Sequence, residues 1–153
     1  MTQAEAVAIA GWRYDAPYSF YDWTADPDDL AELLGRDTPE GKYFSAVDAN
    51  AELVGWFAFS QTGDLVHFGL GLRPDLTGRG LGLAYVETGL AFARERFKPQ
   101  RFRLSVAVFN ERAIRVYERA GFEAARTFDH ETNGGIHPFV EMTRGSTAVA
   151  TSA

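Results

Sequence analysis

The chain has 153 residues, a net charge of −6 and no cysteine. This length suits a single domain with a real core. The acidic balance argues against a nucleic-acid partner, because phosphate contacts need clustered Lys and Arg. The lack of Cys excludes disulfides, thiolate metal ligands and a Cys nucleophile. The N-terminus carries Glu5 and no basic start, and no apolar run reaches membrane-spanning length, so we expect a cytoplasmic protein without a membrane partner.

The first part of the chain is predicted to hold two short helices. Thr2 is placed to cap the first, whose apolar residues recur at helical spacing as far as Ala10. Asp26 before Pro27 opens the second, and Gly35 ends it. Because this chain begins almost at the first helix, we do not expect a full first strand.

Three strands, at 43–47, 53–59 and 65–72, are predicted to follow as an antiparallel meander. A longer helix comes after a glycine-rich stretch, with one apolar stripe from Leu83 to Phe97, and it breaks before Pro99. Its stripe is expected to pack on the sheet.

The remainder is predicted to add a strand, a helix and a hairpin. Apolar residues alternate over 102–108, Asn110 stands where a helix N-cap belongs, and Gly121 fits the position just past the helix end. A hairpin should follow, with strands at 123–130 and 136–143 that turn through Asn133-Gly134-Gly135. We therefore expect one domain over 1–143 and a flexible tail over 144–153.

The order of strand, helix and strand from residue 65 to 108 forms a crossover unit. Such a unit places its two strands parallel, so this pair should be the parallel element of an otherwise largely antiparallel sheet. Alternation along the strand at 65–72 puts His67, Gly69 and Gly71 on one face. Glycine within a strand marks a bulge or the close approach of another group.

Residues 69–83, GLGLRPDLTGRGLGL, have the pattern of an anion-binding loop before a helix. Glycine lets the backbone approach a phosphate, and the start of a helix offers unpaired N–H groups with a partial positive charge. A P-loop would need Gly-Lys-Ser/Thr at its end, where this chain has Gly-Leu-Gly. A dinucleotide-binding fingerprint would need a small residue at Leu83 or Tyr85. Neither motif is present.

This segment resembles motif A of the GNAT acyltransferases, in which Arg/Gln-x-x-Gly-x-Gly/Ala follows a strand and binds the pyrophosphate of acyl-CoA. Thr77 stands where that motif usually has Arg or Gln. Residues 102–122, FRLSVAVFNERAIRVYERAGF, resemble motif B of the same family. The resemblance implies an α/β GNAT fold: a mixed, mostly antiparallel sheet flanked by helices, with a splayed parallel strand pair that binds acyl-CoA. It also implies acetyl-CoA as acyl donor and no metal.

The resemblance assigns the cofactor to the glycine-bearing strand and the loop after it. The pantetheine arm would pair with the strand where Gly69 and Gly71 clear one face, and the N–H groups of the loop would meet the pyrophosphate. Arg79 is available in place of the side chain missing at Thr77, and Asn110 can contact the cofactor as well as cap its helix. The predicted cofactor-binding residues are Leu70, Gly71, Leu72, Gly78, Arg79, Gly80, Leu81, Gly82, Leu83 and Asn110.

Tyr117 matches the GNAT tyrosine that acts as general acid toward the leaving thiolate; a buried aromatic of the helix is the alternative. A phenol can protonate a thiolate whose thiol is a somewhat stronger acid. A strand N–H, from Leu70 or Leu72, would meet the oxyanion. His67 is the predicted general base because it titrates in the useful range, although a surface histidine would look the same. Asp22, Glu141 or a chain of waters are alternatives.

The segment WRYDAPYSFYDW, residues 12–23, combines aromatic and acidic side chains. In GNAT proteins the region of the first two helices walls the acceptor site, which suggests an aromatic pocket for a cationic amine. Core packing explains about half of these rings equally well. The residues predicted to bind the acceptor are Trp12, Tyr18, Tyr21 and Asp22.

The sequence therefore predicts an acetyl-CoA-dependent N-acetyltransferase that transfers the acetyl group directly to a small-molecule or peptide amine. The family resemblance leaves the acceptor open and allows a homodimer. A catalytically silent acyl-CoA-binding or regulatory module is the main alternative, which Tyr117 disfavours. A nucleotide hydrolase would lack both its P-loop lysine and a metal site.

Overall fold

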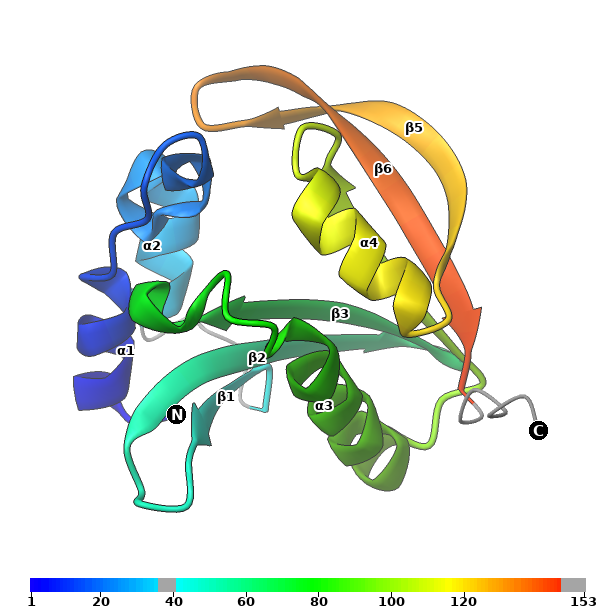
Figure 1. Cartoon of the computed structure of the whole chain (residues 1–153), viewed down its shortest axis with the longest axis horizontal. Coiled ribbons are helices and arrows are strands. Elements are labelled where there is room, and N and C mark those ends of the chain that lie inside the picture. The colour runs from blue at the N-terminus through cyan, green and yellow to red at the C-terminus, as the bar shows by residue number, and fades with distance from the viewer. Residues whose placement is uncertain (36–40, 147–153) are drawn as a thin grey trace.

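The computed structural model describes residues 1–35 and 41–146, which form one six-stranded sheet with helices around it (Figure 1). The strand order is β1-β2-β3-β4-β6-β5. The strands are β1 (Tyr43–Val47), β2 (Leu53–Thr62), β3 (Leu65–Leu72), β4 (Arg101–Ala107), β5 (Glu123–Thr132) and β6 (Gly135–Gly145). The helices are α1 (Gln3–Ala10), α2 (Pro27–Leu34), α3 (Gly82–Phe97) and α4 (Glu111–Arg119), with 3-10 turns η1 (Tyr18–Tyr21), η2 (Trp23–Ala25) and η3 (Pro74–Leu76). The first element is thus a helix and not a strand, as expected.

Three of the four α-helices begin at the caps that the sequence predicts. The Thr2 hydroxyl accepts the Glu5 N–H while the Glu5 side chain accepts the Thr2 N–H, which completes a capping box. Asp26 accepts N–H groups of the first turn of α2, and Asn110 accepts the Ala113 N–H of α4. Each side chain satisfies backbone donors that the helix itself leaves unpaired.

The only parallel neighbours among the described strands are β3 and β4, which confirms the predicted crossover. They pair over three residues, from Leu65 opposite Arg101 to His67 opposite Arg103. Beyond His67 the two strands diverge, and in Figure 1 α1 and α2 lie near the wide end of the resulting wedge. The tip of the β5–β6 hairpin reaches toward α2 across this opening (Figure 1). The wedge is therefore walled by segments far apart in the sequence.

Two apolar cores hold the layers together. The larger lies between the sheet and helices α3 and α4, where Phe68, Leu90, Phe102 and Phe122 are almost fully buried. The smaller lies under α1 and α2, where Ile9 and Leu33 pack with aromatic side chains of β1 and β2. Within residues 1–35 and 41–146, no helix is long and apolar enough to cross a membrane.

The structure corrects several predicted boundaries. Among them, β2 continues to Thr62 instead of ending at 59, and β5 continues to Thr132 instead of ending at 130. Strand β4 ends at Ala107, so Val108 lies beyond it, and Gly135 belongs to β6 rather than to the hairpin turn. Asn133 and Gly134 alone form that turn, with φ of 52° and 74°. The tail predicted from residue 144 is wrong at its start, because β6 continues to Gly145.

The reason for this longer strand is a buried arginine. Arg144 is 7% exposed and donates from Nη1 to the Ala120 carbonyl at 2.6 Å, which pairs an acceptor at the C-terminus of α4. A single Arg in a small polar stretch gives no local signal for burial. The rest of the predicted tail, residues 147–153, lies outside the described residues.

Gly89 in α3 marks the closest approach of this helix to the sheet. A Cβ there would lie 2.6 Å from a ring carbon of Phe57 and 2.7 Å from one of Phe68. Helix propensity alone would favour Gly89→Ala by roughly 0.5–1 kcal/mol, but overpacking a core costs about 1–3 kcal/mol. We expect the substitution to lower the free energy of unfolding in a denaturant titration. Ala91→Gly, exposed on the same helix, measures the propensity term alone, and a stabilised Gly89→Ala variant would contradict the packing argument.

Candidate active site

The wedge between β3 and β4 opens into two pockets that share residues. The loop pocket, about 240 Å³, lies between β3, the glycine loop and helices α3 and α4. The aromatic pocket, about 350 Å³, lies between the wedge, the 3-10 turns and the β5–β6 hairpin. Both pockets are lined by Leu70, Gly71, Leu72, Arg112 and Tyr117. A molecule that filled the loop pocket could therefore present one end to the aromatic pocket.

The backbone of β3 offers hydrogen-bonding groups to the wedge. The Arg73 N–H donates to the Val54 carbonyl of β2 at 2.8 Å. In an antiparallel pair every second residue bonds to the neighbouring strand, so Gly71 also faces β2. Peptide groups of Leu70 and Leu72 then point away from β2, toward the opening. The Tyr14 hydroxyl donates to the Leu72 carbonyl, as this orientation requires. Since β4 has diverged here, the N–H groups of Leu70 and Leu72 face the wedge.

The glycine loop and the start of α3 form an anion-binding geometry. Gly78 and Gly80 have φ of 71° and 77°, a conformation that other residues rarely adopt. Leu81 occupies the N-cap of α3 and provides no side-chain hydrogen bond, so the first N–H groups of this helix have no capping acceptor. These N–H groups carry the positive end of the helix dipole. The structure therefore suits a phosphate at this position.

Most, but not all, of the predicted cofactor-binding residues line the loop pocket. Arg79 is exposed and Leu83 packs against the main core, and neither lines this pocket. Asn110 lines the aromatic pocket instead. The predicted residues that line the loop pocket are Leu70, Gly71, Leu72, Gly78, Gly80, Leu81 and Gly82.

The glycines of β3 have a different role from the one expected. A Cβ on Gly71 would lie 2.3 Å from Nε1 of Trp56, and one on Gly69 would lie 3.6 Å from the same indole. The Trp56 ring therefore covers the face that these glycines were predicted to leave open for the pantetheine arm. The opening for a ligand is along the strand edge, where β4 departs, and not on the strand face.

Tyr117 lies where the two pockets meet, as its predicted role requires. It projects from α4, and burial raises the pKa of its phenol well above its usual range. The phenol is therefore protonated at physiological pH. A neutral O–H at this junction can donate a proton. The ring of Tyr117 makes an edge contact with Phe122, which follows α4, with ring centres 6.1 Å apart.

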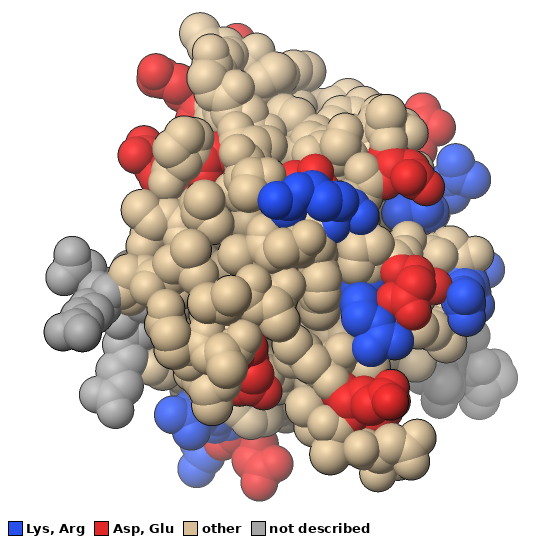
Figure 2. Space-filling view, turned by 90° about the vertical axis from the view of Figure 1, so that its left-hand side faces the viewer, with Lys and Arg blue, Asp and Glu red and all other residues tan. Residues whose placement is uncertain are grey.

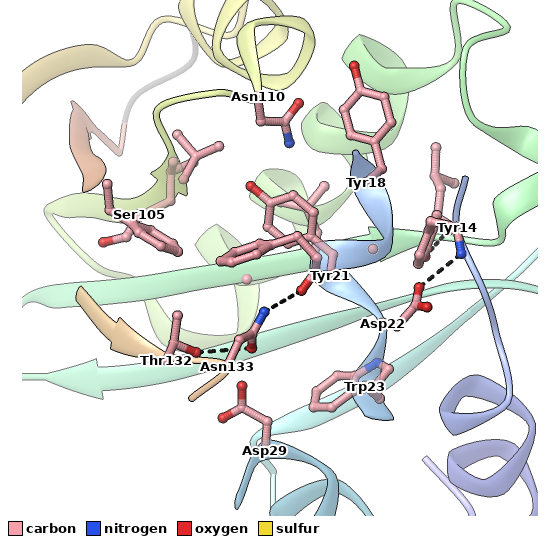
Figure 3. A pocket seen from close by; sticks show the side chains of 18 of the residues that line it. Tyr14, Tyr18, Tyr21, Asp22, Trp23, Asp29, Ser105, Asn110, Thr132 and Asn133 are labelled. Carbon is pink, nitrogen blue, oxygen red and sulfur yellow. Dashed lines mark hydrogen bonds between the residues drawn. The ribbon is translucent and has the colours of Figure 1, made fainter. Parts of the chain in front are cut away.

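Several predicted acceptor residues do line the aromatic pocket. Figure 3 shows Tyr18, Tyr21 and Asp22 around it, with the Asp22 carboxylate accepting the Tyr14 N–H at 2.9 Å. The Tyr21 hydroxyl accepts the Ala107 N–H at 3.2 Å. This bond ties η1 to the end of β4, so the wall of the pocket is anchored to the wedge.

Trp12 is the exception, because it packs in the small core with Ile9 and does not line the aromatic pocket. The aromatic run is thus divided between packing and pocket. The signal for Trp12 lay in its position at the end of α1, where an apolar side chain continues the buried face of that helix.

Sequence reasoning missed the contribution of the hairpin and of α2. Asp29, His130, Thr132 and Asn133 also line the aromatic pocket. The second oxygen of the Asp26 carboxylate accepts the Thr132 hydroxyl at 2.9 Å and the Asn133 N–H at 3.0 Å, while the first caps α2. One carboxylate thus fastens the hairpin tip to α2. No local pattern could indicate it, because the partners are more than a hundred residues apart.

His67 is not placed to act as a general base. It lines neither pocket, it contacts the Arg103 guanidinium, and burial together with that cation lowers the pKa of its imidazole. Glu141, the other residue considered on this face, accepts Arg103 at 3.3 Å and Arg126 at 2.7 Å. Glu141 also lines neither pocket, so it is not placed to take a proton from a bound amine.

The charge on the surface seen in Figure 2 is of mixed sign. Figure 2 shows a face on which uncharged side chains form a broad area and basic and acidic groups are scattered. In the described ranges, no three His, Asp or Glu side chains gather closely enough to hold a metal ion.

Comparison with known proteins gives a consistent result. Residues 8–122 match the acetyltransferase (GNAT) family. Over 58 residues the chain is 40% identical to mycothiol acetyltransferase from Propionibacterium freudenreichii, an alignment that covers 38% of this chain and only 18% of that enzyme.

Two solved structures share the whole architecture. Spermidine N-acetyltransferase from Vibrio cholerae, in complex with CoA and spermine, superposes with a TM-score of 0.76 at 20% identity, over 95% of this chain and 92% of that one. A GNAT family acetyltransferase from Bacillus anthracis gives 0.74 at 15% identity, with 95% and 92% covered. At such low identity these matches establish the fold, and they confirm the one predicted.

Proposed function

Because the chain belongs to the acetyltransferase (GNAT) family, we propose that it transfers an acetyl group from acetyl-CoA directly to a primary amine within a ternary complex. The observation that carries this proposal is the junction of the two pockets at Leu70–Leu72 and Tyr117. A donor in the loop pocket and an acceptor in the aromatic pocket would meet there. Direct transfer needs no nucleophile from the protein, and no Cys is present to act as one.

The donor side fits acetyl-CoA in three respects. The edge of β3 presents Leu70 and Leu72 peptide groups that a pantetheine amide can pair with. The glycine loop and the uncapped start of α3 suit a pyrophosphate. The apolar lining from Leu76, Val86 and Val116 suits the methylene chain between them.

The reaction itself is a nucleophilic attack that this geometry can assist. The amine nitrogen bonds to the thioester carbonyl carbon, and the N–H of Leu70 or Leu72 donates to the oxygen as its negative charge develops. The C–S bond then breaks, and Tyr117 gives its proton to the departing sulfur. Only the neutral amine carries the lone pair for this attack, so a substrate ammonium first gives a proton to solvent water or to Asp22, a carboxylate that lines the aromatic pocket. After the N–C bond forms, the nitrogen loses a second proton to solvent, and solvent returns a proton to the Tyr117 phenolate.

The acceptor side favours a small cationic amine. Two carboxylates, Asp22 and Asp29, line the aromatic pocket beside Trp23, Tyr18 and Tyr21. Aromatic faces and carboxylates together attract an ammonium or a stem that carries one. The bound spermine of the Vibrio cholerae enzyme is a ligand of this kind. The net charge of −6 adds a long-range attraction for such a substrate and makes polyanions poor acceptors.

A screen of amines that detects the free thiol of CoA tests the proposed function. We expect turnover with one or more cationic amines in the absence of added metal. Tight binding of acetyl-CoA without turnover on any amine would favour the alternative, a silent acyl-CoA-binding module. Failure to bind acetyl-CoA at all would refute both.

Asp22→Asn should raise KM for the amine severalfold and leave KM for acetyl-CoA nearly unchanged. The substitution keeps the hydrogen bond from the Tyr14 N–H and removes only the negative charge. Steady-state kinetics with each substrate varied in turn measures the two constants. Asp15→Asn, in the same segment but outside the pocket lining, is the matched control. An equal loss for both substrates would indicate structural damage, and no loss for either would place the acceptor elsewhere.

A further inference from the structure

We propose that Arg112, in the first turn of α4, supplies the side-chain charge for the CoA pyrophosphate that the glycine loop lacks at Thr77. The inference rests on the proposed function, since it assumes that the loop pocket holds CoA. It concerns which side chain completes the phosphate site in this particular chain.

The basic and polar side chains of the loop itself do not place a positive charge in the loop pocket. The Thr77 hydroxyl donates to the Pro74 carbonyl at 2.7 Å, which closes the η3 turn. Arg73 is paired with Asp75 through two hydrogen bonds, at 2.6 and 3.1 Å. Arg79 is exposed and outside the pocket. The loop therefore offers main-chain donors but no cationic side chain that lines the loop pocket.

Arg112 reaches the loop from the opposite wall. Its Nη1 lies 3.7 Å from the position that a Cβ on Gly78 would take, so the guanidinium is beside the loop backbone. It is the only Lys or Arg among the described residues that lines the loop pocket. A phosphate between the start of α3 and α4 would have N–H groups on one side and Arg112 on the other.

The guanidinium of Arg112 is also available for a ligand. Within the described part of the chain it has no carboxylate partner and no hydrogen bond, while its neighbour Arg115 is paired with Glu111. The planar group presents five donors in a fixed arrangement that matches phosphate oxygens. An arginine that faces a pocket without a partner has its charge free to bind an anion.

Tyr18 holds Arg112 in this position. The guanidinium carbon lies 4.0 Å from the centre of the Tyr18 ring, a cation–π contact. Tyr18 belongs to the aromatic pocket and Arg112 to both pockets. Tyr18 is thus a positioning residue, through which a wall of the acceptor pocket supports the phosphate site.

The test compares CoA and 3′-dephospho-CoA, which share the pyrophosphate and differ in the 3′-phosphate. Isothermal titration of Arg112→Ala should show affinities for both ligands lower than wild type by roughly tenfold or more, because a charge-assisted contact is lost from each. Arg112→Lys should recover part of the affinity. Arg115→Ala, on the exposed side of the same helix, is the control and should bind both ligands as wild type does.

Substitutions of Tyr18 provide a second test of the same inference. Tyr18→Phe keeps the ring under the guanidinium and should bind CoA normally, whereas Tyr18→Ala should weaken binding severalfold. The affinities of both ligands are again measured by titration of the protein without an acceptor, so the result does not depend on turnover.

Two results would overturn the inference itself, and a third would refute the proposed function. A loss confined to CoA would assign Arg112 to the 3′-phosphate, and unchanged affinity for both ligands in a folded Arg112→Ala variant would remove its role. Binding of neither ligand by the wild-type protein would instead refute the proposed function. Circular dichroism of each variant separates these outcomes from unfolding, and Arg112→Gln substitutes for Arg112→Ala if that variant does not fold.

Discussion

Replacing Tyr117 by Phe should lower kcat by roughly 10² to 10⁴ and leave the affinity for CoA unchanged, the range expected when a positioned general acid is lost. The phenol lies at the junction of the two pockets, and burial keeps it protonated by raising its pKa. Phe keeps the ring and its edge contact with Phe122, so only the O–H is removed. Single-turnover kinetics with the acceptor found in the screen measures the chemical step directly.

Tyr85→Phe is the matched control for this experiment. Tyr85 also lines the loop pocket, but its hydroxyl lies within hydrogen-bonding distance of the Trp56 and Gly71 carbonyls of neighbouring strands. We expect its loss to reduce stability by about 1 kcal/mol and to leave kcat within a few-fold. If Tyr117→Phe behaves like this control, Tyr117 serves packing only and the proton comes from another group.

The pH profile provides an independent check on Tyr117. A tyrosine is the active acid below its pKa, and burial raises that pKa above the usual value of about 10. The contribution of Tyr117 to kcat should therefore persist as the pH rises through about 10. A fall of kcat well below that pH that disappears in Tyr117→Phe would contradict the raised pKa.

Gly80→Asp should weaken the binding of acetyl-CoA by roughly tenfold to a hundredfold. The substitution places a negative charge in the loop expected to surround a pyrophosphate. It also forces a side chain onto a residue with φ of 77°. Calorimetric titration of the free protein gives the affinity without any need for the acceptor.

Two further variants separate charge from strain. Gly80→Ala adds a Cβ that meets nothing within 4 Å, so it carries the backbone strain alone. Gly63→Asp combines charge and positive φ, at 61°, in the β2–β3 turn outside both pockets. We expect Gly80→Asp to bind much more weakly than either. Equal affinities for Gly80→Asp and Gly80→Ala in folded proteins would remove the phosphate from this loop.

The two pockets differ in how many segments of the chain build them, and this explains why the acceptor is harder to predict than the reaction. The loop pocket is built almost entirely from the continuous stretch 70–86 and from α4, and its chemistry is that of the backbone. The aromatic pocket draws on η1, η2, α2, the wedge and the hairpin tip. Changes in η2, α2 or the hairpin tip would alter the proposed acceptor pocket without touching a residue of the loop pocket.

The sequence by itself determined most of the helices and strands and the parallel strand pair. Helix starts at Thr2, Asp26 and Asn110 depend on hydrogen bonds within four residues, and the parallel pairing of β3 with β4 follows from the handed crossover through α3. The glycine loop presents its backbone N–H groups within one short stretch, so a donor site could be predicted there from the sequence. Local interactions are encoded locally, which is why the predicted helix starts and the predicted strand pairing were confirmed.

Only the tertiary structure decided which side chains meet across the wedge. Trp56 fills the space beside Gly71, Trp12 enters a core, and His67 lies against Arg103, each through a neighbour on another strand or helix. Arg112 faces the glycine loop only because α4 packs beside α3. Such contacts depend on how elements pack and where paired strands separate, which the order of residues along one element does not specify.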